Sequence, residues 1–252
     1  MKFSDTNVRV VLFDIDGVLV DVSNSYRKAI AETASHFLGR EITLNAVKRY
    51  KNIGGYNDDW DCTAAMLNDA GVKVPFDRIV KEFQRRYRGQ DWDGLIANEP
   101  PLVEEETFEN LKSDGRVLGI VTGRPREEAE WTLDKFGWEE WFPLLVAKEQ
   151  QDGRTKPDPF CLQKAIAMFG AAGTQLDAHE VVYVGDSIDD MRAARRAGVW
   201  PIGVIPPYQD DGKHFERLDD AGAEFVLDCV NKIHDVLNGV TEEEDRRARA
   251  RA

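Results

Sequence analysis

Short apolar runs alternate with helical patterns along most of this chain, and that alternation restricts the fold more than any other feature. Strand-like runs rich in Val and Ile occur at 8–14, 116–122, 144–147, 181–185 and 201–205. Helical spacing of apolar residues occurs at 103–113, 125–136, 158–169 and 188–197, and a weaker strand–helix pair at 224–238. Strands that alternate with helices form parallel sheets covered on both faces. The sequence therefore predicts an α/β fold with a doubly wound, Rossmann-like parallel sheet.

The segment between the first two strands has a different character. It predicts helices at 23–38, 43–51, 58–70 and 76–88 and no strand, with Ser23 as the cap of the first helix. We therefore expect an all-α helical cap at 22–94, inserted into a core formed by 1–21 and 95–240. The residues at 241–252 are charged and poor in apolar side chains, which predicts a disordered tail or a frayed helix.

Charge and cysteine content exclude some classes of partner. The 252 residues carry 33 Lys+Arg and 46 Asp+Glu, a net charge of −13, which argues against nucleic acid and anionic membranes as partners. Residues 22–98 hold 12 Lys+Arg and 10 Asp+Glu, a net charge of +2, so the other residues carry a net charge of −15. The three cysteines form no C-x-x-C pair, which fits a reduced compartment. With no signal pattern and no apolar run of membrane-spanning length, we expect a cytoplasmic protein of unknown oligomeric state.

Asp14-Ile15-Asp16-Gly17 ends the first strand and is the strongest chemical signal in the chain. A carboxylate can attack phosphorus and form an aspartyl phosphate, and a second one nearby can protonate the leaving alcohol and later deprotonate water. Asp14 is the candidate nucleophile and Asp16 the candidate acid/base. The alternative is an ordinary strand end followed by an Asx turn.

Two further motifs supply groups that bind phosphate. Thr122-Gly123 ends the second strand just before a helix, where a hydroxyl and backbone N–H groups can hold phosphoryl oxygens. Lys156 begins the rigid segment Lys-Pro-Asp-Pro, and its ammonium can neutralise both the nucleophile and the phosphoryl group. Taken alone, Thr122 is as compatible with helix capping, and Lys156 with a surface turn.

The fourth motif, Gly185-Asp186-Ser187-Ile188-Asp189-Asp190, follows another strand and provides carboxylates for a metal. Mg²⁺ prefers oxygen ligands and keeps several waters, so one or two carboxylates here together with Asp14 suffice. Asp186 is the better direct ligand, whereas Asp190 either orients Lys156 or holds a metal-bound water. An acidic cluster at a helix start can also act only on the helix dipole.

The four motifs, in this order at successive strand ends, resemble the haloacid dehalogenase superfamily. The similarity covers about residues 8–205 and fits the branch with a helical cap inserted after the first motif, which contains phosphoglycolate phosphatase-like and beta-phosphoglucomutase-like proteins. It implies a nucleophile at Asp14, an acid/base at Asp16, phosphate binding by Thr122 and Lys156, and Mg²⁺ held by Asp14, Asp186 and the main-chain carbonyl of Asp16. The dehalogenases themselves lack the second aspartate, so Asp16 argues against carbon–halogen cleavage.

These features predict a Mg²⁺-dependent phosphatase that hydrolyses a small organic phosphate monoester. A sugar-phosphate mutase is the alternative enzyme, although the segment at 51–57 lacks the Ser-Arg pair expected of mutases on this branch. A non-catalytic binding protein is a third reading, against which the intact motif set argues. From the cap, Arg27, Lys51 and Asn57 are the candidate substrate-binding residues. The four histidines share no spacing and receive no catalytic role.

Overall fold

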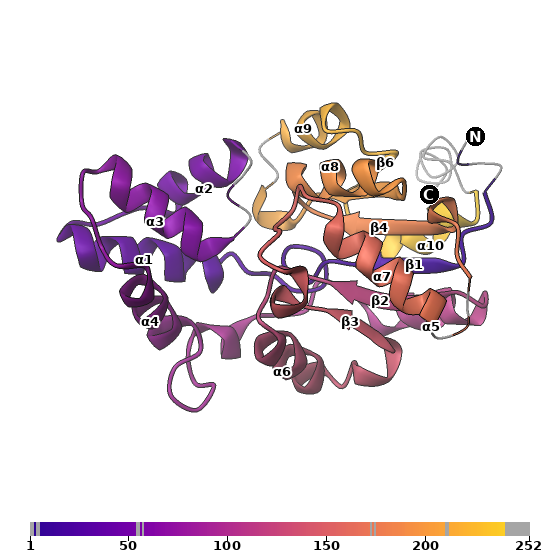
Figure 1. Cartoon of the computed structure of the whole chain (residues 1–252), viewed down its shortest axis with the longest axis horizontal. Coiled ribbons are helices and arrows are strands. Elements are labelled where there is room, and N and C mark those ends of the chain that lie inside the picture. Colours follow the sequence, from indigo (N-terminus) through magenta and orange to yellow (C-terminus); the bar gives the residue numbers. More distant parts are fainter. Residues whose placement is uncertain are drawn as a thin grey trace, which may run out of the picture.

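The computed structural model of the chain describes residues 3, 6–53, 56, 58–171, 173, 175–209 and 212–239. It contains a parallel sheet flanked by helices, with a group of helices projecting from one end (Figure 1). The strands are β1 (Val10–Phe13), β2 (Val117–Val121), β3 (Leu144–Val146), β4 (Val181–Gly185), β5 (Trp200–Val204) and β6 (Phe225–Leu227). Their order, β3-β2-β1-β4-β5-β6, reverses direction beside β1, and this doubly wound arrangement confirms the predicted fold class.

The central strand β1 shows why the sheet is covered on both faces. Successive side chains of a strand point to opposite faces. Val11 and Phe13 pack in the cluster that contains α5 (Glu105–Ser113), α6 (Arg126–Phe136) and α10 (Ile233–Leu237). Val10 and Leu12 pack against α7 (Phe160–Ala171) and α8 (Ile188–Ala197). All four β1 side chains are buried, so an uninterrupted apolar run was the correct signal for this strand.

Four helices lie between β1 and β2, as the sequence predicted. They are α1 (Tyr26–Leu38), α2 (Leu44–Ile53), α3 (Asp59–Asp69) and α4 (Phe76–Tyr87), followed by a 3₁₀ turn at Leu95–Asn98. They form a separate lobe at the left of Figure 1, and the described residues of this lobe contain no strand. The two connections to the core run side by side: the Asp21 N–H donates to the Pro100 carbonyl at 3.0 Å, and the Leu102 N–H to the Leu19 carbonyl at 2.8 Å.

Two local predictions were wrong. Helix α1 begins at Tyr26, and Ser25 occupies its N-cap position without capping it. The Ser25 hydroxyl donates instead to Glu99, so the predicted cap at Ser23 does not exist. Helix α9 (His214–Asp220) was missed, because seven residues are too few for a periodic pattern. The predictions for the tail at 241–252 and for Gly54 and Gly55 lie outside the described residues.

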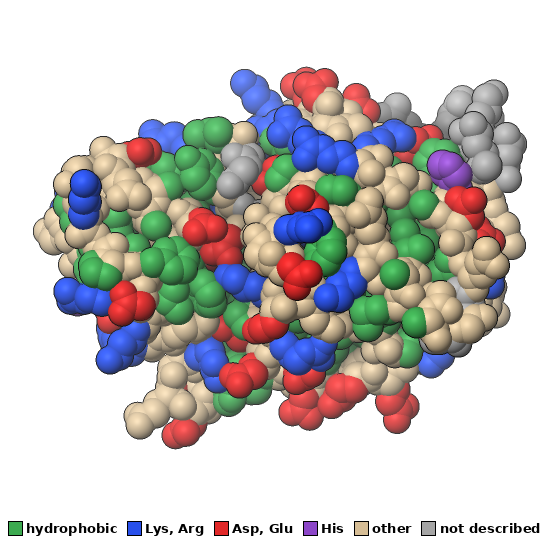
Figure 2. Space-filling model, viewed as in Figure 1, with side chains coloured by type: hydrophobic (Ala, Val, Ile, Leu, Met, Phe, Trp, Pro, Cys, Tyr) green, Lys and Arg blue, Asp and Glu red, His purple; other side chains and the backbone are tan. Residues whose placement is uncertain are grey.

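Three features of the described residues can be compared with the composition: helix hydropathy, surface charge and the state of the cysteines. No helix of the described residues is long and apolar enough to cross a membrane. Figure 2 shows acidic and basic side chains interspersed over the viewed face of both lobes. Cys62 and Cys161 are buried, Cys229 is half-buried, and all three are free thiols.

Candidate active site

Asp14 and Lys156 meet at the carboxyl end of β1. Asp14 directly follows the strand, and its N–H still donates to the Val184 carbonyl of β4, at 2.9 Å. The Lys156 ammonium lies 2.6 Å from Asp14 Oδ2 and 2.7 Å from Asp190 Oδ1, and it donates to the Tyr183 hydroxyl at 2.8 Å. Lys156 is 1% exposed and Asp14 5% exposed. Two motifs separated by 142 positions therefore form one buried ion pair.

The two groups have the charge states that nucleophilic attack requires. Burial raises the pKa of Asp14 to about 6, although the Lys156 ammonium opposes the rise. Burial alone would lower the pKa of Lys156, but the carboxylates of Asp14 and Asp190 outweigh it and hold that pKa well above its usual value. At neutral pH Asp14 is therefore ionised beside a fixed cation.

Asp186 lies next to this pair, beyond the end of β4. Burial and the neighbouring Asp190 raise the pKa of its carboxyl well above the usual range. Gly17, with φ of +73°, passes so close that a Cβ there would lie 2.3 Å from Asp186 Oδ2. A side chain at position 17 would therefore collide with this carboxylate, which explains the glycine of the first motif.

Asp190 serves as an anchor for the lysine. Its Oδ1 accepts from Lys156 and from the Tyr183 hydroxyl, the latter at 3.3 Å. Its Oδ2 accepts from the N–H and the hydroxyl of Ser187, at 3.0 and 2.7 Å. Both oxygens are thus used by protein donors, which favours the lysine-orienting role of Asp190 over a contact with a metal or its bound water.

The remaining carboxylates fit a magnesium ion. Within the described residues no three His, Cys, Asp or Glu side chains are gathered into a complete metal site. Mg²⁺ does not need one, because one or two carboxylates, a carbonyl and several waters satisfy it. Asp186 is only 8% exposed and forms no ion pair with any described residue, and its burial favours the protonated carboxyl. A cation bound beside it would favour the ionised form instead. The oxygen-only donor set of Asp14, Asp186 and the Asp16 carbonyl suits that cation.

Thr122 and Gly123 lie at the end of β2, as expected, but differ in access. Thr122 is fully buried, its hydroxyl accepts from the Arg124 N–H at 3.2 Å, and its carbonyl accepts from Gln151 at 2.6 Å. Gly123 lines the pocket, whereas Thr122 is not among the residues that line it. Backbone groups around Gly123 are therefore more accessible to a ligand than the threonine hydroxyl.

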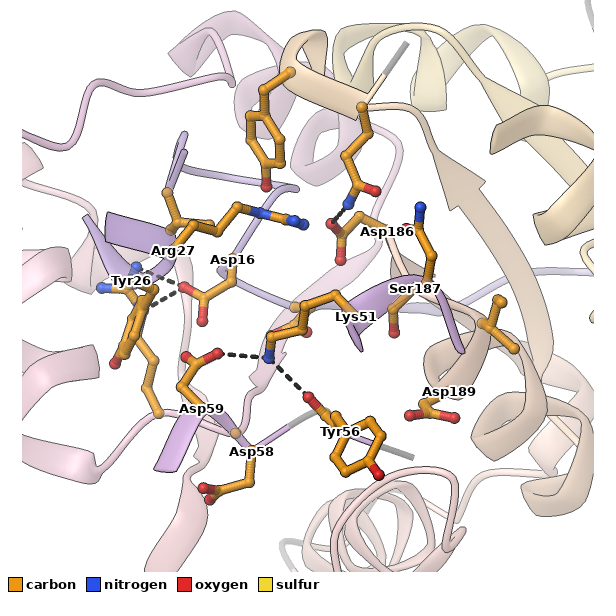
Figure 3. Close-up of a pocket in the computed structure, with 18 of the residues that line it drawn as sticks. Asp16, Tyr26, Arg27, Lys51, Tyr56, Asp58, Asp59, Asp186, Ser187 and Asp189 are labelled. Carbon is orange, nitrogen blue, oxygen red and sulfur yellow. Dashed lines mark hydrogen bonds and ion pairs between the residues drawn. The ribbon is translucent and has the colours of Figure 1, made fainter. Parts of the chain in front are cut away.

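The cap contributes a cation and an ion pair to the same pocket (Figure 3). Arg27 stands over the Tyr208 ring at 4.9 Å, and its charge opposes the rise in the pKa of Asp186, although it forms no ion pair with any described residue. The Lys51 ammonium is held by Asp59, at 2.5 Å, and by the Tyr56 carbonyl, at 2.8 Å. Asn57, the third predicted cap residue, lies outside the described residues. Of the predicted cap groups, Arg27 is thus the cation not already used in an ion pair.

The pocket also includes residues that the sequence did not single out. Lys148, just beyond β3, pairs with Asp58 of the cap and lies 3.5 Å from the centre of the Trp60 ring. Gln209 donates to Asp186 at 3.3 Å, and His214 Nε2 lies 2.8 Å from the Asp186 carbonyl. His214 therefore lines the pocket, although the sequence assigned the histidines no catalytic role. These groups come from short 3₁₀ turns and a short helix, for which periodicity gives no signal.

A buried carboxyl joins the base of the cap to the core. Glu128 of α6 is fully buried and accepts from the Tyr26 hydroxyl of α1 and from Gln84 of α4, the latter at 2.6 Å. Burial raises the pKa of Glu128 from 4.5 to about 7, with the Tyr26 and Gln84 donors opposing the rise. The native state therefore binds more protons here than the unfolded chain between about pH 4.5 and 7, and its stability falls as the pH rises through this range.

We expect Glu128→Gln to remove this pH dependence. The free energy of unfolding of the variant, relative to that of the unmodified protein, should rise by about 3 kcal/mol from pH 4.5 to pH 8. Gln84 Oε1, which has no partner among the described residues, can accept from the new amide. Urea unfolding at several pH values measures the difference. The exposed neighbour variant Glu127→Gln should show no such trend, and an equal trend in both variants would contradict the assignment.

Comparisons with known proteins agree with this geometry. Residues 8–198 match the family model described as haloacid dehalogenase-like hydrolase. The chain is 30% identical over 206 residues to a phosphoglycolate phosphatase of Xanthomonas campestris pv. campestris, covering 80% of this chain and 85% of that protein. It is 32% identical over 234 residues to an imidazoleglycerol-phosphate dehydratase of Phytophthora nicotianae, covering 87% of this chain but only 50% of that longer protein.

A solved structure shows the same fold. The crystal structure of a hydrolase from Deinococcus radiodurans, with bound phosphate and sodium, superposes with a TM-score of 0.70 at 21% identity, over 94% of this chain and 97% of that one. The family match covers most of the chain, and the motifs that carry it converge at the carboxyl ends of β1, β2 and β4. The chain therefore belongs to the haloacid dehalogenase-like hydrolases, with a four-helix cap inserted between β1 and β2.

Proposed function

We propose that this chain is a Mg²⁺-dependent phosphatase that hydrolyses a small organic phosphate monoester. The observation that carries the proposal is the ionised Asp14 held 2.6 Å from the Lys156 ammonium, in a pocket that Asp16, Asp186 and the cap also line. A binding protein would not need a nucleophile and an acid/base at one sheet edge. The similarity to a phosphoglycolate phosphatase also supports hydrolysis of a phosphate monoester.

The reaction proceeds in two displacements. A carboxylate oxygen of Asp14 attacks phosphorus while the bond to the ester oxygen breaks, giving an aspartyl phosphate. Asp16 donates a proton to the departing alcohol. A water molecule then attacks the same phosphorus, loses its proton to Asp16, and releases inorganic phosphate and the free Asp14 carboxylate.

Charge neutralisation lets the two anions approach. Lys156 remains protonated throughout, and the backbone N–H groups around Gly123, with Thr122 behind them, face the phosphoryl oxygens. Mg²⁺ would be held by Asp14, Asp186 and the Asp16 carbonyl, and it would supply further positive charge for those oxygens. Asp190 holds the lysine in place through its 2.7 Å ion pair.

The cap selects the alcohol part of the substrate. The core motifs bind the phosphate, which all substrates of this class share, so selection must come from groups of the segment at 22–94 that close over the site. Arg27 is the cation available there, because Lys51 is already paired with Asp59. A half-buried guanidinium without a carboxylate partner favours a substrate with a second anionic group.

Phosphate release from a panel of phosphorylated metabolites, assayed with Mg²⁺, tests the function. We expect inorganic phosphate to appear in amounts equal to the free alcohol, fastest for esters that carry a second anionic group. Accumulation of an isomeric phosphate ester without phosphate release would establish a mutase instead. A lack of turnover on every ester, with retained ligand binding, would establish a binding protein.

We expect Arg27→Gln to separate substrates by charge. The loss of a charged hydrogen bond should lower kcat/KM for an ester with a second anionic group roughly ten- to hundred-fold. Hydrolysis of a simple aryl phosphate should fall much less, because its leaving group offers Arg27 no partner. Arg78→Gln is the matched control, since Arg78 also stands over an aromatic ring, Phe37, but on the outer surface of the cap. Equal losses on both esters would contradict the substrate-binding role of Arg27.

A further inference from the structure

Arg124 is a buried cation that lies between two carboxylates. Its side chain is fully inaccessible, and its guanidinium lies 2.6 Å from Asp16 Oδ1 and 2.9 Å from Glu99 Oε2. In the sequence it directly follows Thr122-Gly123, and only those two neighbours were assigned roles. The pair with Asp16 links the second motif directly to the candidate acid/base.

The guanidinium is held on every side. Its Nη1 donates to the Thr132 hydroxyl at 2.7 Å, and its plane lies 5.1 Å from the centre of the Tyr26 ring. Glu99, which receives another of its N–H groups, is itself fixed by the hydroxyls of Ser25 and Tyr87. These partners come from α6, from the cap helices α1 and α4, and from both connections to the cap. Arg124 is therefore a rigid support and not a mobile surface charge.

The contacts with Asp16 are one-sided. Nε and Nη2 of Arg124 both reach Oδ1, and no described group bonds to Oδ2. In Figure 3 one carboxylate oxygen of Asp16 receives these contacts while the other points into the cavity. Fixing one oxygen fixes the direction of the other, because a carboxylate is planar and rotates as a unit. The oxygen that faces the cleft is the one available for proton transfer.

We propose that Arg124 is a positioning residue for Asp16, which aims the free carboxylate oxygen at the leaving group and at the attacking water. The proposal rests on the phosphatase reaction proposed above. The fork of the guanidinium provides two N–H groups to one oxygen while a third binds Glu99, and a lysine cannot reproduce this geometry. Glu99 and Thr132 both hold the guanidinium that contacts Asp16.

The leaving group makes this role measurable. An acidic nitrophenol leaves readily without a proton, whereas an alkyl alcohol needs general-acid assistance. A misdirected Asp16 should therefore slow alkyl esters far more than nitrophenyl phosphate. A variant that only loosens the fold should slow all esters alike.

The experiment compares Arg124→Gln and Arg124→Lys with the unmodified full chain on a series of phosphate monoesters, from nitrophenyl to alkyl. For Arg124→Gln we expect kcat/KM to fall about 10²–10³-fold on the alkyl ester, in the range of general acid–base catalysis, and less than about tenfold on nitrophenyl phosphate. Arg124→Lys should show the same trend with a smaller amplitude. If Arg124→Gln does not fold, Arg124→Lys alone still tests the proposal. Adding Arg124→Gln to Asp16→Asn should cost little further activity, since both changes remove one function.

Arg116→Gln is the matched control, because Arg116 is a largely buried arginine paired with Asp114, at 2.6 Å, at the opposite end of β2. Any fall in kcat/KM of Arg116→Gln should not depend on the leaving group. Losses of equal size along the ester series in the Arg124 variants, or additive losses in the double variant, would overturn the proposal. If the unmodified protein releases no phosphate from any ester, the proposed function fails, and that outcome is distinct from a flat series in the variants.

Discussion

Replacing Asp14 with Asn should abolish turnover and leave the protein folded. The amide has the shape of the carboxylate but is a far weaker nucleophile, so kcat should fall at least about 10³-fold. The fold should survive, because Lys156 keeps its ion pair with Asp190 and its bond to Tyr183. Steady-state phosphate release and the circular dichroism melting curve measure the two effects.

The control for this variant is Asp177→Asn. Asp177 caps the short 3₁₀ turn before β4, at the amino end of the sheet, where its carboxylate accepts from the His179 N–H at 3.0 Å. Its loss should leave turnover unchanged. In addition, a phosphorylated protein should form in the unmodified chain during turnover and be absent from Asp14→Asn. Substantial activity in Asp14→Asn would rule out this residue as the nucleophile.

Removal of Mg²⁺ should have an effect of similar size. The attacking carboxylate and the phosphoryl group are both anionic, and a metal ion contributes several kcal/mol of charge stabilisation in the transition state, equivalent to about a thousandfold in rate. Hydrolysis of an aryl phosphate should therefore stop with chelator and return when Mg²⁺ is added. Turnover at the full rate in chelator would contradict the metal assignment.

A measurement without substrate separates metal binding from catalysis. Mg²⁺ that binds only the native state should stabilise it by about 2.7 kcal/mol at a concentration one hundred times the dissociation constant. The corresponding rise in melting temperature should disappear in Asp186→Asn, because Asp186 is the buried carboxylate without an ion pair among the described residues. Asp177→Asn should retain the rise.

The carboxyl edge of the sheet was predictable from the sequence for a physical reason. In a parallel sheet all strands end at one edge, so Asp14, Thr122 and Asp186 had to approach each other once β1, β2 and β4 were recognised as neighbours. The strands themselves were recognised by continuous β-branched runs. Strand register then places each polar residue within one position of the edge.

The buried polar network beneath the cap was not predictable in this way. Arg124 contacts Asp16 and Glu99, at sequence separations of 108 and 25 residues, and no local pattern pairs such residues. A single charged residue in a sequence normally indicates solvent exposure. Its burial depends on how the two connections to the cap pack against α6, which is tertiary information.

The helix-capping rule also failed where a serine hydroxyl can either cap a helix or bond to a buried carboxylate. Ser25 stands at the N-cap of α1, yet its hydroxyl donates to Glu99 rather than accepting from the helix. Bonding to a buried carboxylate outweighs capping there, because an unsatisfied buried charge costs more than a missing cap. Likewise, Tyr208, Gln209 and His214 reach the site from a three-residue 3₁₀ turn and a seven-residue helix.

The position of β1 at the centre of the sheet sets the order in which the chain can fold. Val10 pairs with Val117 on one side and Val181 on the other, so β1 is synthesised long before either neighbour exists. The helices α1–α4 pack largely with one another and involve much shorter loops. We therefore expect the helices of the inserted lobe to form while the apolar strand Val10–Phe13 is still unpaired, before the rest of the sheet has assembled. In pulsed hydrogen exchange during refolding, amides of α1 and α3 should gain protection before those of β1.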